Sequence, residues 1–115
     1  MAAGRTTIFL EQGTDVIWSY VKTSEGVPFD FTGYTAKMQA RESYDSEDVL
    51  IDMSTDNGAI VIDGEAGKVS LVFKPEHTIG AEWSRAVFDV ELTAPDTTVT
   101  RFIQGTIRLS PEVTK

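Results

Sequence analysis

Most of this chain alternates between apolar and polar residues with a period of two, and this alternation constrains its fold more than any other feature. The clearest stretches are residues 34–41, 68–73 and 86–92. Because successive side chains of a strand point to opposite faces of a sheet, the pattern is typical of half-buried antiparallel strands. We expect the inward residues of several strands to share one core: Trp18, Met38, Leu71, Phe88, Val90 and Ile107.

Turn residues divide the rest of the chain into further short strands, expected at residues 6–11, 15–22, 49–53, 59–63 and 99–109. The alternation of the last strand breaks around Phe102, which a β-bulge would explain. The only helix candidate, Pro75–Trp83, contains Gly80 and is long enough for one or two turns. Short strands with turns about every 8–12 residues indicate a sandwich or barrel. The sequence therefore predicts an all-β fold, an antiparallel β-sandwich of about seven to eight strands with one short helical turn.

The chain has the size and composition of a single domain spanning residues 1–115. Hydrophobic residues make up 41% and charged residues 24%, which is ordinary for a protein with a packed core. The formal net charge of −8 repels phosphate backbones and anionic membrane surfaces. We therefore expect neither nucleic acid nor a membrane as a partner.

The chain has no cysteine, which excludes thiol catalysis and zinc-thiolate sites and fits a reducing compartment. Near the N-terminus the only apolar run is Ile8–Leu10. That run is too short for the core of a signal peptide, so we expect synthesis and folding in a cytoplasm.

No group of residues has the spacing of a catalytic or cofactor site. His77 is the only histidine, so a serine–histidine–acid triad would have to use it, but the chain lacks a Gly-x-Ser-x-Gly turn. Gly67 and Lys68 fail as a phosphate-binding loop, because Ile62 stands where that motif needs glycine and Val69 follows the lysine. We therefore expect no enzyme, no catalytic residue and no cofactor, and we interpret His77 as a solvated turn residue.

Acidic residues gather between two expected strands, at Glu42, Asp45, Glu47 and Asp48. Carboxylate oxygens are the ligands that calcium prefers, and Asp56 would join them if the loops cluster. The spacing matches no defined calcium loop, so we interpret the run as a solvated acidic loop without a metal. Calcium stays the alternative.

Two aromatic residues in expected loops, Tyr44 and Trp83, are candidates for stacking against a ligand. Exposed aromatic rings offer the flat apolar faces on which sugars stack. This arrangement would make the chain a carbohydrate- or host-surface-binding module, with a host-surface glycan as its partner. Trp18 and Tyr20 share a face of one strand and are expected in the core instead.

Two stretches resemble small phage structural proteins. Residues 29–41 open with Phe-Asp-Phe-Thr-Gly-Tyr and continue as an alternating strand. Residues 87–96 read Val-Phe-Asp-Val-Glu-Leu-Thr-Ala-Pro-Asp, and residues 99–114 contain Val-Thr-Arg-Phe-Ile-Gln-Gly and end in Ser-Pro-Glu-Val-Thr. From Gly13 onward the layout is similar to the immunoglobulin-like N-terminal domain of phage baseplate upper proteins.

The resemblance implies an immunoglobulin-like form of the predicted sandwich, in which residues 68–73 and 85–92 take the places of strands E and F. It also implies a non-enzymatic virion structural protein of the tail, baseplate, fibre attachment or head decoration, made in the cytoplasm of a bacterial host. Its partners would be further copies of itself and other virion proteins.

The N-terminal region is the expected assembly interface. Residues 1–5 have no core-forming pattern and are expected to be a flexible arm. Ile8, Phe9 and Leu10 follow in a strand without proline, where a neighbouring chain could add a strand of its own. We therefore expect residues 1–11 to contribute to a homo-oligomer or to a complex with another virion protein.

Overall fold

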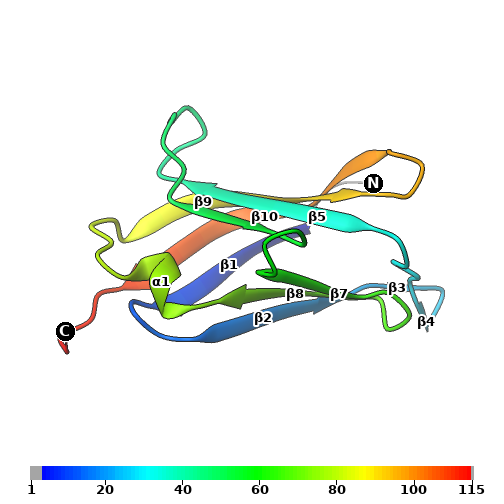
Figure 1. Cartoon of the computed structure of the whole chain (residues 1–115), viewed down its shortest axis with the longest axis horizontal. Helices are drawn as coiled ribbons and strands as arrows, with labels where there is room; N and C mark the ends of the chain where they lie inside the picture. Colours follow the sequence, from blue (N-terminus) through cyan, green and yellow to red (C-terminus); the bar gives the residue numbers. More distant parts are fainter. Residues whose placement is uncertain (1–3, 115) are drawn as a thin grey trace.

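Strands hold 54% of the chain and helix holds 4%, so the predicted all-β fold is confirmed. The computed structural model describes residues 4–114 (Figure 1). The strands are β1 (Gly4–Glu11), β2 (Val16–Val21), β3 (Thr23–Ser24), β4 (Val27–Pro28), β5 (Thr35–Arg41), β6 (Ile51–Ser54), β7 (Ile60–Asp63), β8 (Lys68–Phe73), β9 (Arg85–Thr93) and β10 (Val99–Ser110). One helical turn, α1 (Pro75–Thr78), lies between β8 and β9.

The strands form two larger sheets that face each other across the core. Sheet A has five strands in the order β1-β10-β9-β5-β6, and sheet B has three in the order β2-β8-β7. In Figure 1, β2, β8 and β7 form the lower layer and β1, β10, β9 and β5 lie above them. Strands β3 and β4 form a small separate hairpin. Consecutive strands β1 and β2 therefore belong to opposite sheets.

Strand β1 runs parallel to β10, with Gly4 opposite Ile103 and Glu11 opposite Ser110. Our prediction of a purely antiparallel fold is wrong at this pair, and the sheets are mixed. The predicted arm is also wrong in part. Residues 1–3 lie outside the described residues, but Gly4 and Arg5 belong to β1, because their backbones pair with β10.

Gly105 permits the close approach of β1 to β10. Its partner across the pair is Thr6, and a β-carbon added to Gly105 would overlap the Thr6 carbonyl oxygen. A glycine is therefore needed at this position, where the two backbones approach too closely for a side chain.

The turn from β1 to β2 is held by Gln12, which is 8% exposed. Its side-chain amide donates hydrogen bonds to the carbonyl oxygens of Thr78 (3.1 Å) and Ala81 (3.2 Å). Its side-chain oxygen accepts one from the Glu112 backbone amide at 3.1 Å. Every side-chain polar atom of Gln12 thus has a partner, which is what burial of an amide requires. These bonds connect the turn between β1 and β2 to α1, to the residues that follow α1 and to the C-terminal segment.

The core contains the inward residues that alternation predicts, with one exception. Met38, Leu71, Phe88, Val90 and Ile107 are all at most 2% exposed. Trp18 is only partly buried and packs against the margin of the core. The prediction that Trp18 is buried with the others is wrong, because β2 is an edge strand of sheet B and no described strand covers its open side.

The β-bulge in β10 and the helical turn α1 lie where the sequence predicts them. The register of β10 against β9 shifts between Arg101 and Ile103, which is the predicted bulge. The predicted helix at residues 75–83 is a single turn, α1, and Gly80 beyond it has a φ of 74°. Only glycine adopts that conformation without strain, so the turn ends there.

Replacing Gly105 by alanine is expected to destabilise the protein by about 1–3 kcal/mol, because the added methyl group displaces the Thr6 carbonyl from β10. Gly4→Ala is the matched control. It lies in the same strand pair, and its added β-carbon would be 3.9 Å from the nearest atom, an ordinary contact. Urea unfolding of both variants measures the difference. If both variants unfolded at the same urea concentration, the close contact between Gly105 and the Thr6 carbonyl would not be important for stability.

Candidate functional site

The three residues expected at an N-terminal interface divide between the two faces of sheet A. Ile8 and Leu10 are each 2% exposed, so their side chains belong to the core and are not available to a partner. Three consecutive apolar residues in a strand cannot share a face, because side chains alternate. Phe9 points outward and is 74% exposed. Of the three, Phe9 alone remains a candidate for an interface.

The two loop aromatics predicted to stack on a ligand are not brought together. Tyr44 lies in the β5–β6 connection and is 71% exposed. Trp83 is partly buried and packs against the core between α1 and β9. The indole of Trp83 therefore packs against the core, and of the two predicted aromatics only Tyr44 is largely exposed.

Tyr44 lines a hollow of about 350 Å³ on the outer face of sheet A. Polar and charged side chains from three adjacent strands form most of the lining: Lys37, Gln39, Arg41, Asp52, Asp89 and Glu91. The Asp89 carboxylate also pairs with Arg101 at 3.5 Å across β9 and β10. The hollow thus combines hydrogen-bond donors, acceptors and one exposed aromatic ring.

The outer face of sheet A also concentrates positive charge in a chain whose net charge is −8. Each arginine of the described chain belongs to β1, β5, β9 or β10, with its side chain exposed or partly exposed on this face: Arg5, Arg41, Arg85, Arg101 and Arg108. Of the 18 carboxylates, four belong to strands of sheet A, at Glu11, Asp52, Asp89 and Glu91, and the other 14 lie in sheet B, α1 or the loops. The charge of the molecule is therefore unevenly distributed, which orients an acidic partner toward sheet A.

The open side of β2 is a second candidate surface, which we call the β2 edge (residues 16–21). Its sequence, Val-Ile-Trp-Ser-Tyr-Val, has no charge, proline or glycine. Ile17 and Val21 point to the outer face of sheet B and are 68% and 54% exposed. Val61 on β7 extends this apolar face and is 53% exposed. Exposed uncharged strand edges pair readily with other chains, and most proteins protect them.

On the inner side of β2, Trp18 and Tyr20 lie half-exposed beside the open edge. Their rings stack with centroids 6.4 Å apart. Tyr20 also contacts the buried Phe102 of sheet A, edge to face, at 5.1 Å. The two rings are thus held in place by the core while part of their surface stays in solvent. Partly exposed, rigidly held tryptophan and tyrosine are typical of protein interfaces.

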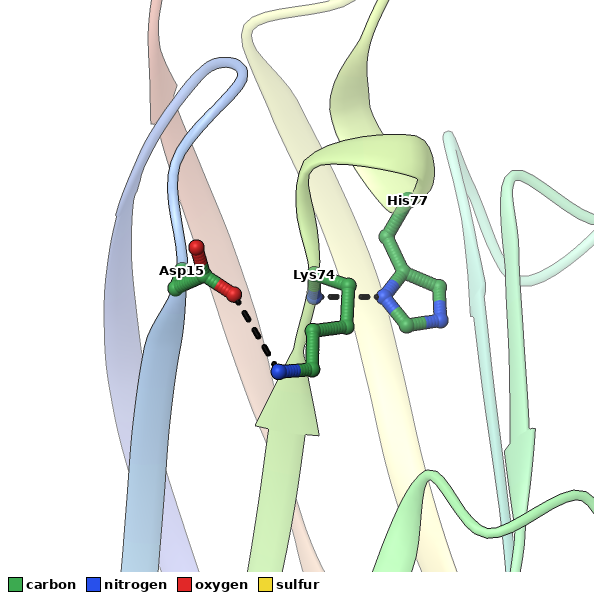
Figure 2. A network of polar contacts seen from close by, with 3 residues as sticks. All are labelled: Asp15, Lys74 and His77. Carbon is green, nitrogen blue, oxygen red and sulfur yellow. Dashed lines mark hydrogen bonds and ion pairs between the residues drawn. The ribbon is translucent and has the colours of Figure 1, made fainter.

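His77 has a structural role just after β8, where α1 begins (Figure 2). Its Nδ1 accepts a hydrogen bond from the Lys74 backbone amide at 2.8 Å, which closes the helical turn α1. The Lys74 ammonium group pairs with the Asp15 carboxylate at 3.3 Å and so ties the start of β2 to the end of β8. Because both partners of that ion pair are more than half exposed, it contributes little to stability.

The loop that contains the acidic run, residues 42–48, is held by hydrogen bonds from the neighbouring Arg41 side chain. The Arg41 guanidinium donates to the carbonyl oxygens of Ser46 at 2.6 Å and Glu47 at 3.2 Å. These bonds occupy backbone oxygens that a calcium ion would use. Within residues 4–114, no three histidine, aspartate or glutamate side chains lie close enough together to hold a metal ion.

Two exposed aspartates have their pKa shifted by turn geometry. The Thr32 hydroxyl and backbone amide donate to Asp30 and lower the pKa of that carboxyl. The Thr98 backbone amide does the same for Asp96, lowering its pKa. Both are short side-chain-to-backbone turns that shape loops, since the carboxylate substitutes for a backbone acceptor.

No protein-family model matches the chain, and no curated protein matches its sequence. Among the residues that the structure describes, no helix is long and apolar enough to cross a membrane.

Sequence reasoning missed both the β2 edge and the buried role of Gln12. A signal for the edge was present, because residues 16–21 are an uncharged run of β-branched and aromatic residues. We interpreted Trp18 and Tyr20 of that run as core residues, since the pattern does not say whether a strand has one neighbour or two. Nothing in the turn sequence around Gln12 distinguishes a buried amide from an exposed one.

Removing divalent metal is expected to leave the thermal midpoint unchanged, because Arg41 already satisfies the backbone oxygens of the acidic loop. Calorimetry with excess EDTA, with calcium and with magnesium measures this. A midpoint that rises with calcium concentration would show a site that binds only the folded state, and the solvated-loop interpretation would then be wrong.

Proposed function

We propose that this chain is an immunoglobulin-like module of a phage or prophage virion, and that it acts by binding other protein chains, not by catalysis. The observation that carries this proposal is the β2 edge, an uncharged open strand beside two half-exposed aromatic rings. Its place in the particle would be the tail, baseplate, fibre attachment or head decoration.

The strand order supports the immunoglobulin-like part of the proposal. Immunoglobulin sandwiches of the variable type place strands B, E and D in one sheet and strands G, F, C and C′ in the other. Sheet B, in the order β2-β8-β7, corresponds to the first set, and β10-β9-β5-β6 corresponds to the second. The helical turn α1 falls in the connection between the equivalents of strands E and F. Phe88 or Val90 takes the position at which antibody domains have a cysteine.

The distribution of surface residues supports protein binding. At the β2 edge, an incoming strand would gain backbone hydrogen bonds together with apolar contact to Ile17 and Val21. It would also cover the exposed parts of Trp18 and Tyr20. An edge that is uncharged along its whole length is costly to keep in solvent, because it invites aggregation. A function that covers this edge explains why it is retained.

The virion part of the proposal is supported by the resemblance of residues 29–41 and 87–114 to phage structural proteins. In such particles many copies of small domains bind one another and their neighbours, which requires exposed self-complementary or partner-complementary surfaces. The β2 edge and the cationic outer face of sheet A are two surfaces of that kind.

Mass spectrometry of washed, intact particles from the encoding phage is expected to detect this protein. Particles assembled with Ile17→Lys in place of the wild-type chain should contain less of it, because the added charge lies in the covered surface. Ile79→Lys is the matched control, since Ile79 is 66% exposed and follows α1, outside both the β2 edge and the strands of sheet A. Intact particles that lack the protein would overturn the virion proposal.

A second candidate function is binding of a host-surface glycan. The observation in its favour is the hollow under Tyr44, where one exposed ring lies among polar side chains on sheet A. Sugars are bound by this combination of an aromatic face and directed hydrogen bonds.

A glycan array tests this candidate. Specific binding that is lost in Tyr44→Ala and retained in Phe9→Ala would support it, since both side chains are exposed aromatics but only Tyr44 lines the hollow. Loss of one stacking contact should weaken binding by about tenfold. Binding that survives Tyr44→Ala would place the glycan elsewhere, and no binding to any glycan would leave protein contacts as the function.

A further inference from the structure

We propose that the partner of the β2 edge is a second copy of this chain, paired antiparallel so that Ser19 of one copy lies opposite Ser19 of the other. This inference rests on the proposed function in protein binding and identifies the partner. The two copies of sheet B would then join into one continuous sheet in the order β7-β8-β2-β2-β8-β7.

The backbone of β2 determines which residues are available for pairing. The Lys22 amide donates to the Gly67 carbonyl oxygen at 2.8 Å, so the N–H group of Lys22 points toward the start of β8. In an antiparallel ladder the direction reverses at each residue. The N–H and C=O groups of Ile17, Ser19 and Val21 therefore point to the open side, where no strand within residues 4–114 pairs with them.

The proposed register satisfies these groups and matches side chains on both faces. A two-fold axis at Ser19 places Ile17 opposite Val21 of the other copy, so each apolar side chain meets another. On the inner face Trp18 lies opposite Tyr20 of the other copy, which extends the existing stack of these rings across the interface. Cross-strand aromatic and β-branched pairs are the contacts that stabilise sheets most.

Charge complementarity favours a second copy in this orientation. Two chains of net charge −8 repel each other unless the contact itself avoids like charges. The six residues of β2 are uncharged and are bracketed by Asp15 at one end and Lys22 at the other. Antiparallel pairing brings the Asp15 end of one copy to the Lys22 end of the other. Parallel pairing would place Asp15 beside Asp15.

The remaining edges of sheets A and B carry charges that oppose such pairing. Strand β1 contains Arg5 and Glu11, β6 contains Asp52, and β7 contains Asp63. Charged side chains on an edge strand are the usual protection against pairing with another chain. β2 is the edge without that protection, so it is the place where two copies join.

A pair of charge variants at the two-fold axis tests the register. The Ser19 side chain is exposed, and its hydroxyl shares one exposed hydrogen bond of 2.8 Å with the Ser70 hydroxyl, so Ser19→Lys and Ser19→Asp are expected to fold normally. Each variant alone places like charges opposite each other and should raise the dimer dissociation constant about tenfold or more. An equimolar mixture of the two should restore dimers, because opposite charges then meet. Val99→Lys is the control and should dimerise like the wild type.

Sedimentation equilibrium of the full chain, over about 1 μM to 1 mM, measures the association. Circular dichroism melting confirms that each variant is folded. Dimers of wild type and of the mixture, with weakened dimers of each single variant, support the proposal. Wild-type protein that stays monomeric over the whole range overturns it, as do Ser19→Lys dimers as stable as those of the wild type.

The result is separable from the test of the proposed function. If the protein is monomeric but is present in particles, and Ile17→Lys reduces its incorporation, the β2 edge binds a different virion protein. Self-pairing is then wrong while the proposed function stands. If the protein dimerises through β2 but is missing from intact particles, the virion proposal fails and self-pairing stands.

Discussion

The parallel pairing of β1 with β10 is the contact on which the rest of the arrangement depends. It places the N-terminal strand at the margin of sheet A, and it requires a glycine at position 105, where the Thr6 carbonyl takes the space of a side chain. The chain must then cross to sheet B to begin β2. Gln12 holds the turn between β1 and β2 with hydrogen bonds to the connection between β8 and β9 and to the C-terminal segment, so these three parts of the chain stabilise one another.

The open edge of β2 follows from that pairing. β1 pairs with β10 in sheet A and not with β2, so sheet B keeps three strands with one uncharged margin. Trp18 and Tyr20 are half-exposed for the same reason, although they face the core. The interaction surface is therefore a consequence of how the N-terminal strand is placed. A change that weakened the β1–β10 pair would act on the proposed interface as well as on stability.

Much of the fold could be predicted from alternation alone. It located the strands within a few residues, identified five of the six expected core side chains, and indicated the bulge near Phe102. The candidate sites were predicted less well. Ile8 and Leu10 proved to be core residues, Trp83 packs against the core, and the edge at residues 16–21 was interpreted as interior. Alternation specifies the face on which a side chain lies, but it carries no information about the neighbours of a strand.

The sequence by itself determined the class of fold and the approximate bounds of the eight longer strands, because these depend on local periodicity and on backbone preferences of glycine and proline, but it missed the short strands β3 and β4. Only the tertiary structure decided which strands pair. That choice placed β1 parallel to β10, left β2 with an open side, and gathered the arginines on sheet A. Pairing depends on contacts between residues far apart in the chain, such as Thr6 with Gly105 and Gln12 with Glu112, and no local pattern encodes them.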